Sequence, residues 1–262
     1  MAANQIIFED GAGYERMMGV WSRLAGERFL DWLAPERGWR WVDVGCGNGA
    51  FTELLVERCA PTEVQGVDPS EAQLAYARGR TAGRVAKFLQ GGAEALPFAG
   101  EHFDAAVMAL VIFFVADPAA GVSEMVRVVR PGGSVSAYAW DITEGGFPLA
   151  SLQQAMKAMD IEPAKPPSAD AARLDNLRQL WTDAGLRDVE TTQITVQREF
   201  AGFDEFWDIA MLSASTRSRL AGLAPAVLEA LRERLRDQLS PGAVGPLTMS
   251  ARANAVKGQV PH

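Results

Sequence analysis

Cysteine is scarce in this chain of 262 residues, which contains only Cys46 and Cys59. Two cysteines are too few for a disulfide framework or a zinc site, so we expect no metal and a reducing, cytoplasmic setting. Apolar runs such as AAVMALVIFFVA are much shorter than the about 20 residues of a membrane span, and the first ten residues do not resemble a secretory signal. We therefore expect no membrane insertion.

Positive charge and histidine are also in short supply. The net charge is −8 and the isoelectric point is about 4.9. Because nucleic-acid affinity comes from Lys and Arg that neutralise phosphates, we expect no nucleic-acid partner. His102 and His262 are the only histidines, and no Tyr-x-x-x-Lys pair is present. An enzyme that transfers hydride to a carbonyl would need another general acid.

The chain instead contains a regular alternation of apolar runs and amphipathic stretches. Strands are predicted at 39–45, 63–68, 85–91, 102–110 and 133–140, and helices at 50–60, 70–80 and 118–130. Ser70 begins a capping box with Gln73, and Asp117 is a natural N-cap before Pro118. Such strand–helix–strand units predict an α/β fold with a doubly wound, Rossmann-like, mostly parallel sheet.

Two further regions flank this alternation. Apolar residues at helical spacing over 14–35 predict an amphipathic N-terminal helix. After residue 140 the pattern predicts a helix at 170–185, a strand at 187–200, helices at 203–212 and 225–239, and a last strand at 246–256. We expect one domain over 1–262, with an N-terminal helical cap (1–38), a cofactor-binding core (39–140) and substrate-side segments (141–262).

The stretch VDVGCGNGAFT at 42–52 ends a strand in alternating glycines and opens a helix. Without side chains, such a turn lets backbone N–H groups approach a ligand closely. Gly45, Gly47 and Ala50 fit the G-x-G-x-x-A pattern of a nicotinamide dinucleotide site, while Asp68, at the end of VQGVD, could accept hydrogen bonds from ribose hydroxyls. Both features suit either a dinucleotide or S-adenosylmethionine, so the turn alone leaves the cofactor open.

Four ordered segments together resemble the class I S-adenosylmethionine-dependent methyltransferases. They are VDVGCGNGAFTELL, VQGVDPSEAQLAYAR, GGAEALPFAGEHFDAAVMAL and EMVRVVRPGGSVSAY. The resemblance is strongest to the bacterial group that contains the ubiquinone and menaquinone C-methyltransferases and the type 11 methyltransferase domain. It covers residues 14–140 closely and the closing strands loosely. It implies a seven-stranded sheet with an antiparallel last strand and a helical insertion near the C-terminus.

The resemblance also implies which residues bind S-adenosylmethionine. The methionine portion would lie along Asp43, Gly45, Cys46 and Gly47. Asp68, followed by Pro69, would hold the ribose, Ala93 and Glu94 would edge the adenine, and Ala109 would lie beside the cofactor. Arg23 would bind the cofactor carboxylate, with Arg16 in reserve, and Tyr14 would close over the methionine portion. Two positions depart from the family pattern, because Gly92 replaces an aspartate and Phe113 replaces a histidine.

The chemistry expected is the in-line transfer of a methyl group to a small organic acceptor, which needs alignment and a water-poor pocket more than a metal. Trp21, Phe113, Phe114 and Trp140 are candidates to face the sulfonium. Asp141, Glu144 and Tyr138 are candidate bases, although we expect an acceptor that needs none. Such an enzyme would be a monomer or a homodimer. The alternatives are a nicotinamide-dependent oxidoreductase and a non-catalytic binder of S-adenosylmethionine.

Overall fold

A seven-stranded sheet forms the centre of the protein, in the order β3-β2-β1-β4-β5-β7-β6. The computed structural model describes residues 15–80, 82, 85–240, 242 and 245–262. The strands are β1 (Arg40–Val44), β2 (Glu63–Asp68), β3 (Ala86–Gln90), β4 (Phe103–Ala109), β5 (Val129–Trp140), β6 (Arg187–Phe200) and β7 (Leu247–Gln259). Strands β1 to β5 pair in parallel, and β7 is antiparallel to both β5 and β6. The predicted mostly parallel sheet with an antiparallel last strand is confirmed.

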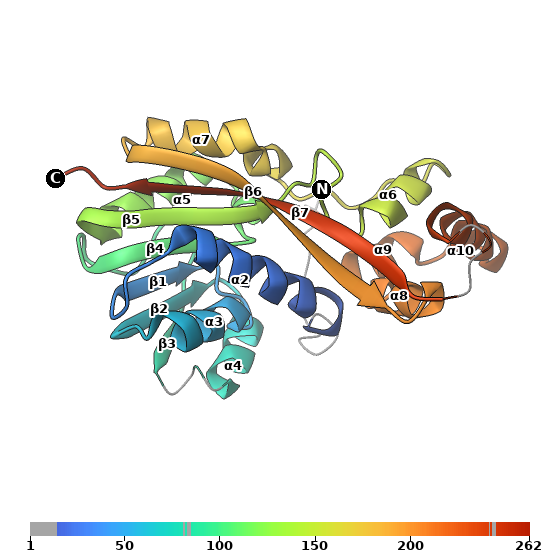
Figure 1. The fold of residues 1–262 in the computed structure, drawn as a ribbon, viewed down its shortest axis with the longest axis horizontal. Helices are drawn as coiled ribbons and strands as arrows, with labels where there is room; N and C mark the ends of the chain where they lie inside the picture. The colour runs from blue at the N-terminus through green and yellow to red at the C-terminus, as the bar shows by residue number, and fades with distance from the viewer. Residues whose placement is uncertain (1–14, 81, 83–84, 241, 243–244) are drawn as a thin grey trace.

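Helices cover both faces of this sheet (Figure 1). One face is covered by α2 (Val20–Leu33), α3 (Ala50–Cys59) and α4 (Glu71–Gly79), and the other by α5 (Pro118–Val128) and α7 (Leu174–Asp183). The central strands are therefore buried on both sides, which explains why they read as continuous apolar runs rather than as alternating ones.

The expected helix starts are present. The Ser70 hydroxyl accepts a hydrogen bond from the Gln73 N–H at 3.4 Å, and the Asp117 carboxylate accepts one from Ala120 N–H at 3.1 Å. The N-terminal helix begins with a short π-helical turn, η1 (Glu15–Gly19), whose Met17 carbonyl accepts a hydrogen bond from Arg198 on β6 at 3.1 Å. This contact fixes the start of the helix against the edge of the sheet.

A helical lobe lies beyond the sheet, where β6 and β7 continue past their neighbours (Figure 1). It contains α8 (Phe203–Ala210), α9 (Ala214–Leu220) and α10 (Pro225–Leu239), and α6 (Ala150–Lys157) packs against α10. There are also two short 3-10 turns among the described residues: η3 (Ile112–Phe114) follows β4, and η4 (Ala169–Ala172) precedes α7. The predicted helical insertion is confirmed, whereas α6 and α9 are additional to the prediction.

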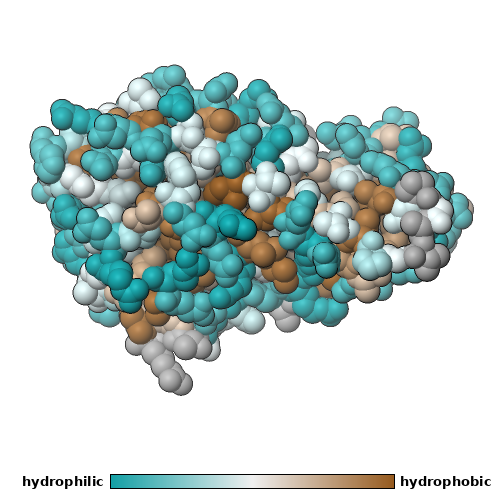
Figure 2. Space-filling model, viewed as in Figure 1, coloured by the Kyte–Doolittle hydropathy of each residue, from teal (hydrophilic) through white to brown (hydrophobic). Residues whose placement is uncertain are grey.

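The distribution of polar and hydrophobic surface matches the division into a sheet-containing part and a helical lobe. Figure 2 shows polar side chains over most of the sheet-containing part, with hydrophobic surface gathered between it and the helical lobe. Among the described residues, no helix is both long enough and apolar enough to cross a membrane.

Candidate functional site

The glycine turn between β1 and α3 has the backbone form that its sequence predicts. Gly45, Gly47 and Gly49 all have positive φ, at 74°, 52° and 78°. At Gly45 a Cβ atom would lie 2.4 Å from the Val111 side chain, whereas at Gly47 it would meet nothing within 4 Å. Gly45 is therefore needed for packing against the segment after β4, and Gly47 leaves an open approach to the backbone.

Asp43, the last polar residue of β1, lies directly beneath this turn. Its side chain is fully buried, and its Oδ2 accepts a 2.6 Å hydrogen bond from the Thr52 hydroxyl. Its Oδ1 is buried without a hydrogen-bond partner among the described residues. Burial, the largest cause, raises the pKa of Asp43, the Thr52 hydrogen bond lowers it and the nearby Asp68 carboxylate raises it, with a net result of about 7.

Asp68 ends β2 and binds the turn directly. Its Oδ2 accepts a hydrogen bond from Gly47 N–H at 3.0 Å and its Oδ1 accepts one from Ser70 N–H at 2.8 Å. A carboxylate has about four acceptor sites, so these two bonds leave room for ligand hydroxyls. Burial raises the pKa of Asp68, and the two backbone N–H groups oppose the shift. Pro69, which follows, is exposed.

Cys46 lies between these groups. Its side chain is buried, and burial together with Asp43 and Asp68 raises the pKa of its thiol well above the ordinary range. A thiol that stays protonated is a poor nucleophile, so Cys46 contributes backbone and packing rather than reactivity.

The segments after β3 and β4 lie at the same edge of the sheet. Residues 91–94 form a tight bend in which Gly92 pairs with Ala95, and Ala93 is half-buried. The Glu94 carboxylate is exposed and accepts a 2.9 Å hydrogen bond from Asp117 N–H. Ala109 ends β4 and is followed by Leu110, whose φ of 62° is unusual for a residue with a side chain. Because the chain winds outward on both sides of β1 and β4, a ligand crevice is expected at these strand ends.

An arginine that the sequence did not single out fastens the glycine turn. Arg80 donates to the Asn48 carbonyl at 2.7 Å and forms ion pairs with Glu53 at 2.9 Å and Glu15 at 2.6 Å. Glu15 also accepts a hydrogen bond from the Asn48 amide at 3.0 Å. The N-terminal helix is thereby tied to the turn. Tyr14, the residue expected to close over the cofactor, lies outside the described residues.

Arg23, the residue expected at the cofactor carboxylate, contacts helix carboxylates and not the glycine turn among the described residues. Its guanidinium is about half exposed and forms ion pairs with Glu27 at 3.1 Å and Glu57 at 2.9 Å. Glu57 is in the last turn of α3, about 10 Å along the helix from the glycine turn at 1.5 Å per residue. An amphipathic helix usually places Arg on its solvent face, and Arg23 follows that rule. Arg16, the reserve, is also exposed.

A mostly apolar cavity is lined by the segment after β4, whose Val111 packs on Gly45, and we call it the mouth cavity. It lies at the ends of β4 and β5, and Met17 and Met18 of η1 contribute to its wall. Three of the four aromatic residues that the sequence analysis named as candidates to face the sulfonium line it, namely Phe113, Phe114 and Trp140. Phe114 is 38% exposed. Trp21 does not line it and instead packs in the core against Phe200, with ring centroids 6.5 Å apart.

Each of the three candidate bases already contacts other side chains of the protein. Asp141 is buried and bound by Arg252 at 2.6 Å, and Glu144 forms an ion pair with Arg173 at 3.2 Å. Tyr138 is buried among the rings of Phe29 and Phe51, at 4.6 and 5.6 Å between centroids. None of the three lines the mouth cavity.

Residues 42–137, which include the turn, Asp68 and the mouth-cavity aromatics of η3, match a family model described as a methyltransferase domain. This segment of the chain is therefore similar to methyltransferase domains. Among the alternatives that the glycine turn left open, the match favours a methyltransferase over a nicotinamide-dependent oxidoreductase.

Individual methyltransferases show the same relationship. The chain is 33% identical over 147 residues to malonyl-acyl-carrier-protein O-methyltransferase of Pectobacterium atrosepticum, covering 56% of this chain and 54% of that protein. The fold matches Haemonchus contortus phosphoethanolamine N-methyltransferase 2, solved with S-adenosylmethionine, at TM-score 0.59 and 18% identity over 95% of this chain and 56% of that one. It matches geranyl diphosphate methyltransferase, also solved with S-adenosylmethionine, at TM-score 0.54 and 20% identity over 96% and 91%.

The curated relatives are longer than the matched part. The chain spans about half the length of most curated relatives that it matches, with shares of 27 to 54%. The described residues would suit S-adenosylmethionine, the cofactor expected from the sequence, in two ways. The open face of Gly47 admits a ligand to the backbone, and the unpartnered Asp43 Oδ1 lies directly beneath the turn.

Proposed function

We propose that this methyltransferase transfers a methyl group from S-adenosylmethionine to a small organic acceptor held in the mouth cavity. The observation that carries the proposal is the juxtaposition at one sheet edge. The glycine turn, with Asp43 and Asp68, meets an apolar cavity lined by Phe113, Phe114 and Trp140, because Val111 packs on Gly45 and its neighbours line the cavity.

When bound, S-adenosylmethionine supplies an electrophilic methyl group on a sulfonium. Asp68 would hold the ribose through the two acceptor sites left by its backbone hydrogen bonds. Asp43, Gly45, Cys46 and Gly47 would accommodate the methionine portion. The remaining proposed contacts come from Pro69, Ala93, Glu94 and Ala109. Arg80 and Glu15 would keep the turn in place rather than bind the ligand themselves.

The chain's main catalytic contributions would be alignment and exclusion of water. An apolar cavity orients the acceptor for an in-line approach, and aromatic faces favour a nearby positive charge. Asp141, Glu144 and Tyr138 are held by other contacts, which supports an acceptor that is already nucleophilic or readily deprotonated by water. The related enzymes are named for acceptors of different chemistry, so they do not single out the methylated atom.

The division of the chain is part of the same proposal. Residues 39–140 would bind the cofactor, the cap at 1–38 would cover it, and segments within 141–262 would form the acceptor side. We propose that the enzyme acts in the cytoplasm as a monomer or homodimer and that nucleic acid is not its partner.

Titration with S-adenosylhomocysteine, the expected product, tests the cofactor. We expect binding and heat stabilisation, and about tenfold weaker binding in Asp68→Asn, because a charged acceptor is lost. Asp31→Asn is the matched control, since Asp31 is exposed and pairs only with Arg58 at 2.7 Å. Binding of NADH instead would support the oxidoreductase alternative. Tight S-adenosylhomocysteine binding with no transfer of labelled methyl to a broad acceptor panel would support the non-catalytic binder.

A further inference from the structure

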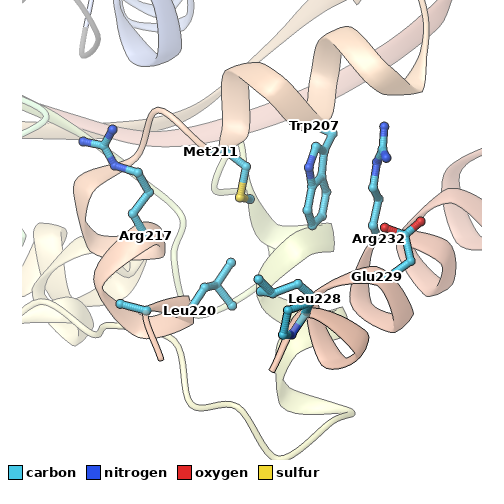
Figure 3. Close-up of a pocket in the computed structure, with 9 residues that line it drawn as sticks. Trp207, Met211, Arg217, Leu220, Leu228, Glu229 and Arg232 are labelled. Carbon is cyan, nitrogen blue, oxygen red and sulfur yellow. The ribbon is translucent and has the colours of Figure 1, made fainter. Parts of the chain in front are cut away.

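A second cavity, open to solvent on one side, lies on the helical lobe, and we call it the lobe cavity. It has a volume of about 460 Å³ and is formed by α8, α9 and α10. Trp207 and Met211, from α8 and its end, face Leu220 of α9 and Leu228 of α10 across an apolar interior (Figure 3). This volume is in the range of small-molecule sites, which are usually apolar with a few placed polar groups.

Two arginines line the lobe cavity, and they differ in their partners. Arg232 forms an ion pair with Asp204 at 2.9 Å. Arg217 has no carboxylate within 4 Å among the described residues, although Arg236 and Arg232 share Asp204 nearby. Figure 3 shows Arg217 at the edge of the cavity opposite Glu229 and Arg232, with the apolar residues between them. Arg217 therefore supplies positive charge that no carboxylate of the described chain balances.

Arg217 borders both cavities. It is the one residue that lines both the lobe cavity and the mouth cavity. On the mouth side, its neighbours Ser213, Ser215 and Thr216 present hydroxyls beside the apolar wall. A ligand that occupies both cavities would therefore lie beside Arg217.

We propose that the acceptor is an amphiphilic carboxylic acid, an inference that rests on the proposed function. Its nucleophilic head enters the mouth cavity, its carboxylate binds Arg217, and its apolar chain fills the lobe cavity. Arg suits this role because its planar guanidinium binds a carboxylate through two parallel hydrogen bonds. An apolar ligand without charge would leave that group unused, and a small acid without a chain would leave the lobe cavity unfilled.

The reaction balances for such an acceptor. A bond forms between the acceptor nucleophile, such as an amine or thiol at the carbon next to the carboxylate, and the methyl carbon. The bond between that carbon and the donor sulfur breaks, and its electron pair stays on the sulfur. The proton of the amine or thiol goes to solvent.

Calorimetric binding of three probes tests the charge and the chain separately. Decanoate carries both, decanol carries only the chain, and butyrate carries the charge with little chain. We expect decanoate to bind at least tenfold more tightly than either of the others. In Arg217→Gln, decanoate binding should weaken about tenfold while decanol binding stays unchanged, since a charge-assisted hydrogen bond is lost. Arg219→Gln is the matched control, because Arg219 is on the same helix and lines neither cavity.

A cavity-filling variant tests the position of the chain. Leu228→Trp should weaken decanoate at least tenfold and leave butyrate unaffected. Equal decanoate binding by wild type and Arg217→Gln, equal binding of decanol and decanoate, or displacement of decanoate by S-adenosylhomocysteine would each overturn the inference. Transfer of labelled methyl to 2-aminodecanoate or 2-mercaptodecanoate, reduced in Arg217→Gln but not in Arg219→Gln, would support it directly.

Failure of this inference is distinguishable from failure of the proposed function. Every variant is first titrated with S-adenosylhomocysteine, whose site is at the glycine turn and not in the lobe. Normal titration without decanoate binding overturns the acceptor class alone. Absence of S-adenosylhomocysteine binding in wild type overturns the proposed function.

Discussion

Asp43 is a buried acid without a cationic partner, so the fold strongly affects its ionisation. Its pKa is raised from the model-compound value of 3.8 to about 7. The folded protein therefore holds a proton that the unfolded chain has released between these pH values. Stability from this group is fully present below pH about 4 and is lost as the pH rises through about 7.

We predict that Asp43→Asn removes this pH dependence. The free energy of unfolding of the variant minus that of wild type should be on the order of 2 kcal/mol larger at pH 8 than at pH 5, because one pKa unit corresponds to about 1.4 kcal/mol. Urea unfolding at the two pH values measures it, with Asp31→Asn as the exposed control. An unchanged difference between wild type and Asp43→Asn at pH 5 and pH 8 would show that Asp43 is ionised throughout.

Replacing Arg80 or Arg23 by Gln removes the same positive charge, but we expect different effects at the two positions. Arg80 is 14% exposed and contacts Asn48, Glu53 and Glu15, whereas Arg23 is 53% exposed in its ion pairs. Arg80→Gln should cost about 2 kcal/mol and weaken S-adenosylhomocysteine about tenfold, because it releases the turn from the N-terminal helix. Arg23→Gln should change stability by less than about 1 kcal/mol and leave binding unchanged.

Thermal unfolding and calorimetric titration of the two arginine variants decide between them. Weaker binding in Arg23→Gln alone would restore the role that the family resemblance assigned to Arg23.

The sequence could place Asp43 and Asp68, because strand ends and glycines mark their positions locally. It could not find Arg80, since its partners at 15, 48 and 53 are brought to it only by tertiary packing.

The start of α5 is the element whose capping also supports the proposed adenine-side segment. Asp117 accepts from Ala120 N–H, and its own N–H donates to Glu94. Asp117→Ala should cost about 1 kcal/mol, and Asp117→Asn should cost little because Asn is an equally good N-cap. S-adenosylhomocysteine affinity should fall less than threefold in both, since the Glu94 contact uses the backbone. A loss of binding equal to that of Asp68→Asn would place Asp117 in the cofactor site itself.

Elements with strong periodicity and clear boundaries were predictable. β6 occupies the predicted 187–200 and α10 the predicted 225–239, because Gly185 and Phe200 flank an alternating run and Pro225 begins a long amphipathic one. The short α6 and α9 were not predictable. Within α9 only Leu220 is buried, so its sequence lacks the apolar stripe that predicts a helix, although Ser213 caps it by accepting from Thr216 N–H.

At the scale of the whole molecule, the chain enters and leaves the helical lobe through β6 and β7. Phe200 at the end of β6 pairs with Leu247 at the start of β7, and α8, α9 and α10 lie between them in the sequence. The glycine turn, Asp68 and the 91–94 bend all belong to the other part. The proposed division of labour therefore predicts that cofactor binding does not need the lobe, whereas acceptor binding does.

Replacing residues 201–246 by Asn-Gly tests this division, because a two-residue turn of that type joins paired antiparallel strands without strain. We expect cooperative unfolding and S-adenosylhomocysteine affinity within threefold of wild type. The mouth cavity loses Leu212 to Arg217 from its wall, so methyl transfer should fall at least a hundredfold. Some loss of stability is expected because Phe206 packs against Phe200 at 5.4 Å. Loss of S-adenosylhomocysteine binding in a variant that still unfolds cooperatively would mean that the lobe shapes the cofactor site, and the division into cofactor and acceptor parts would then be wrong.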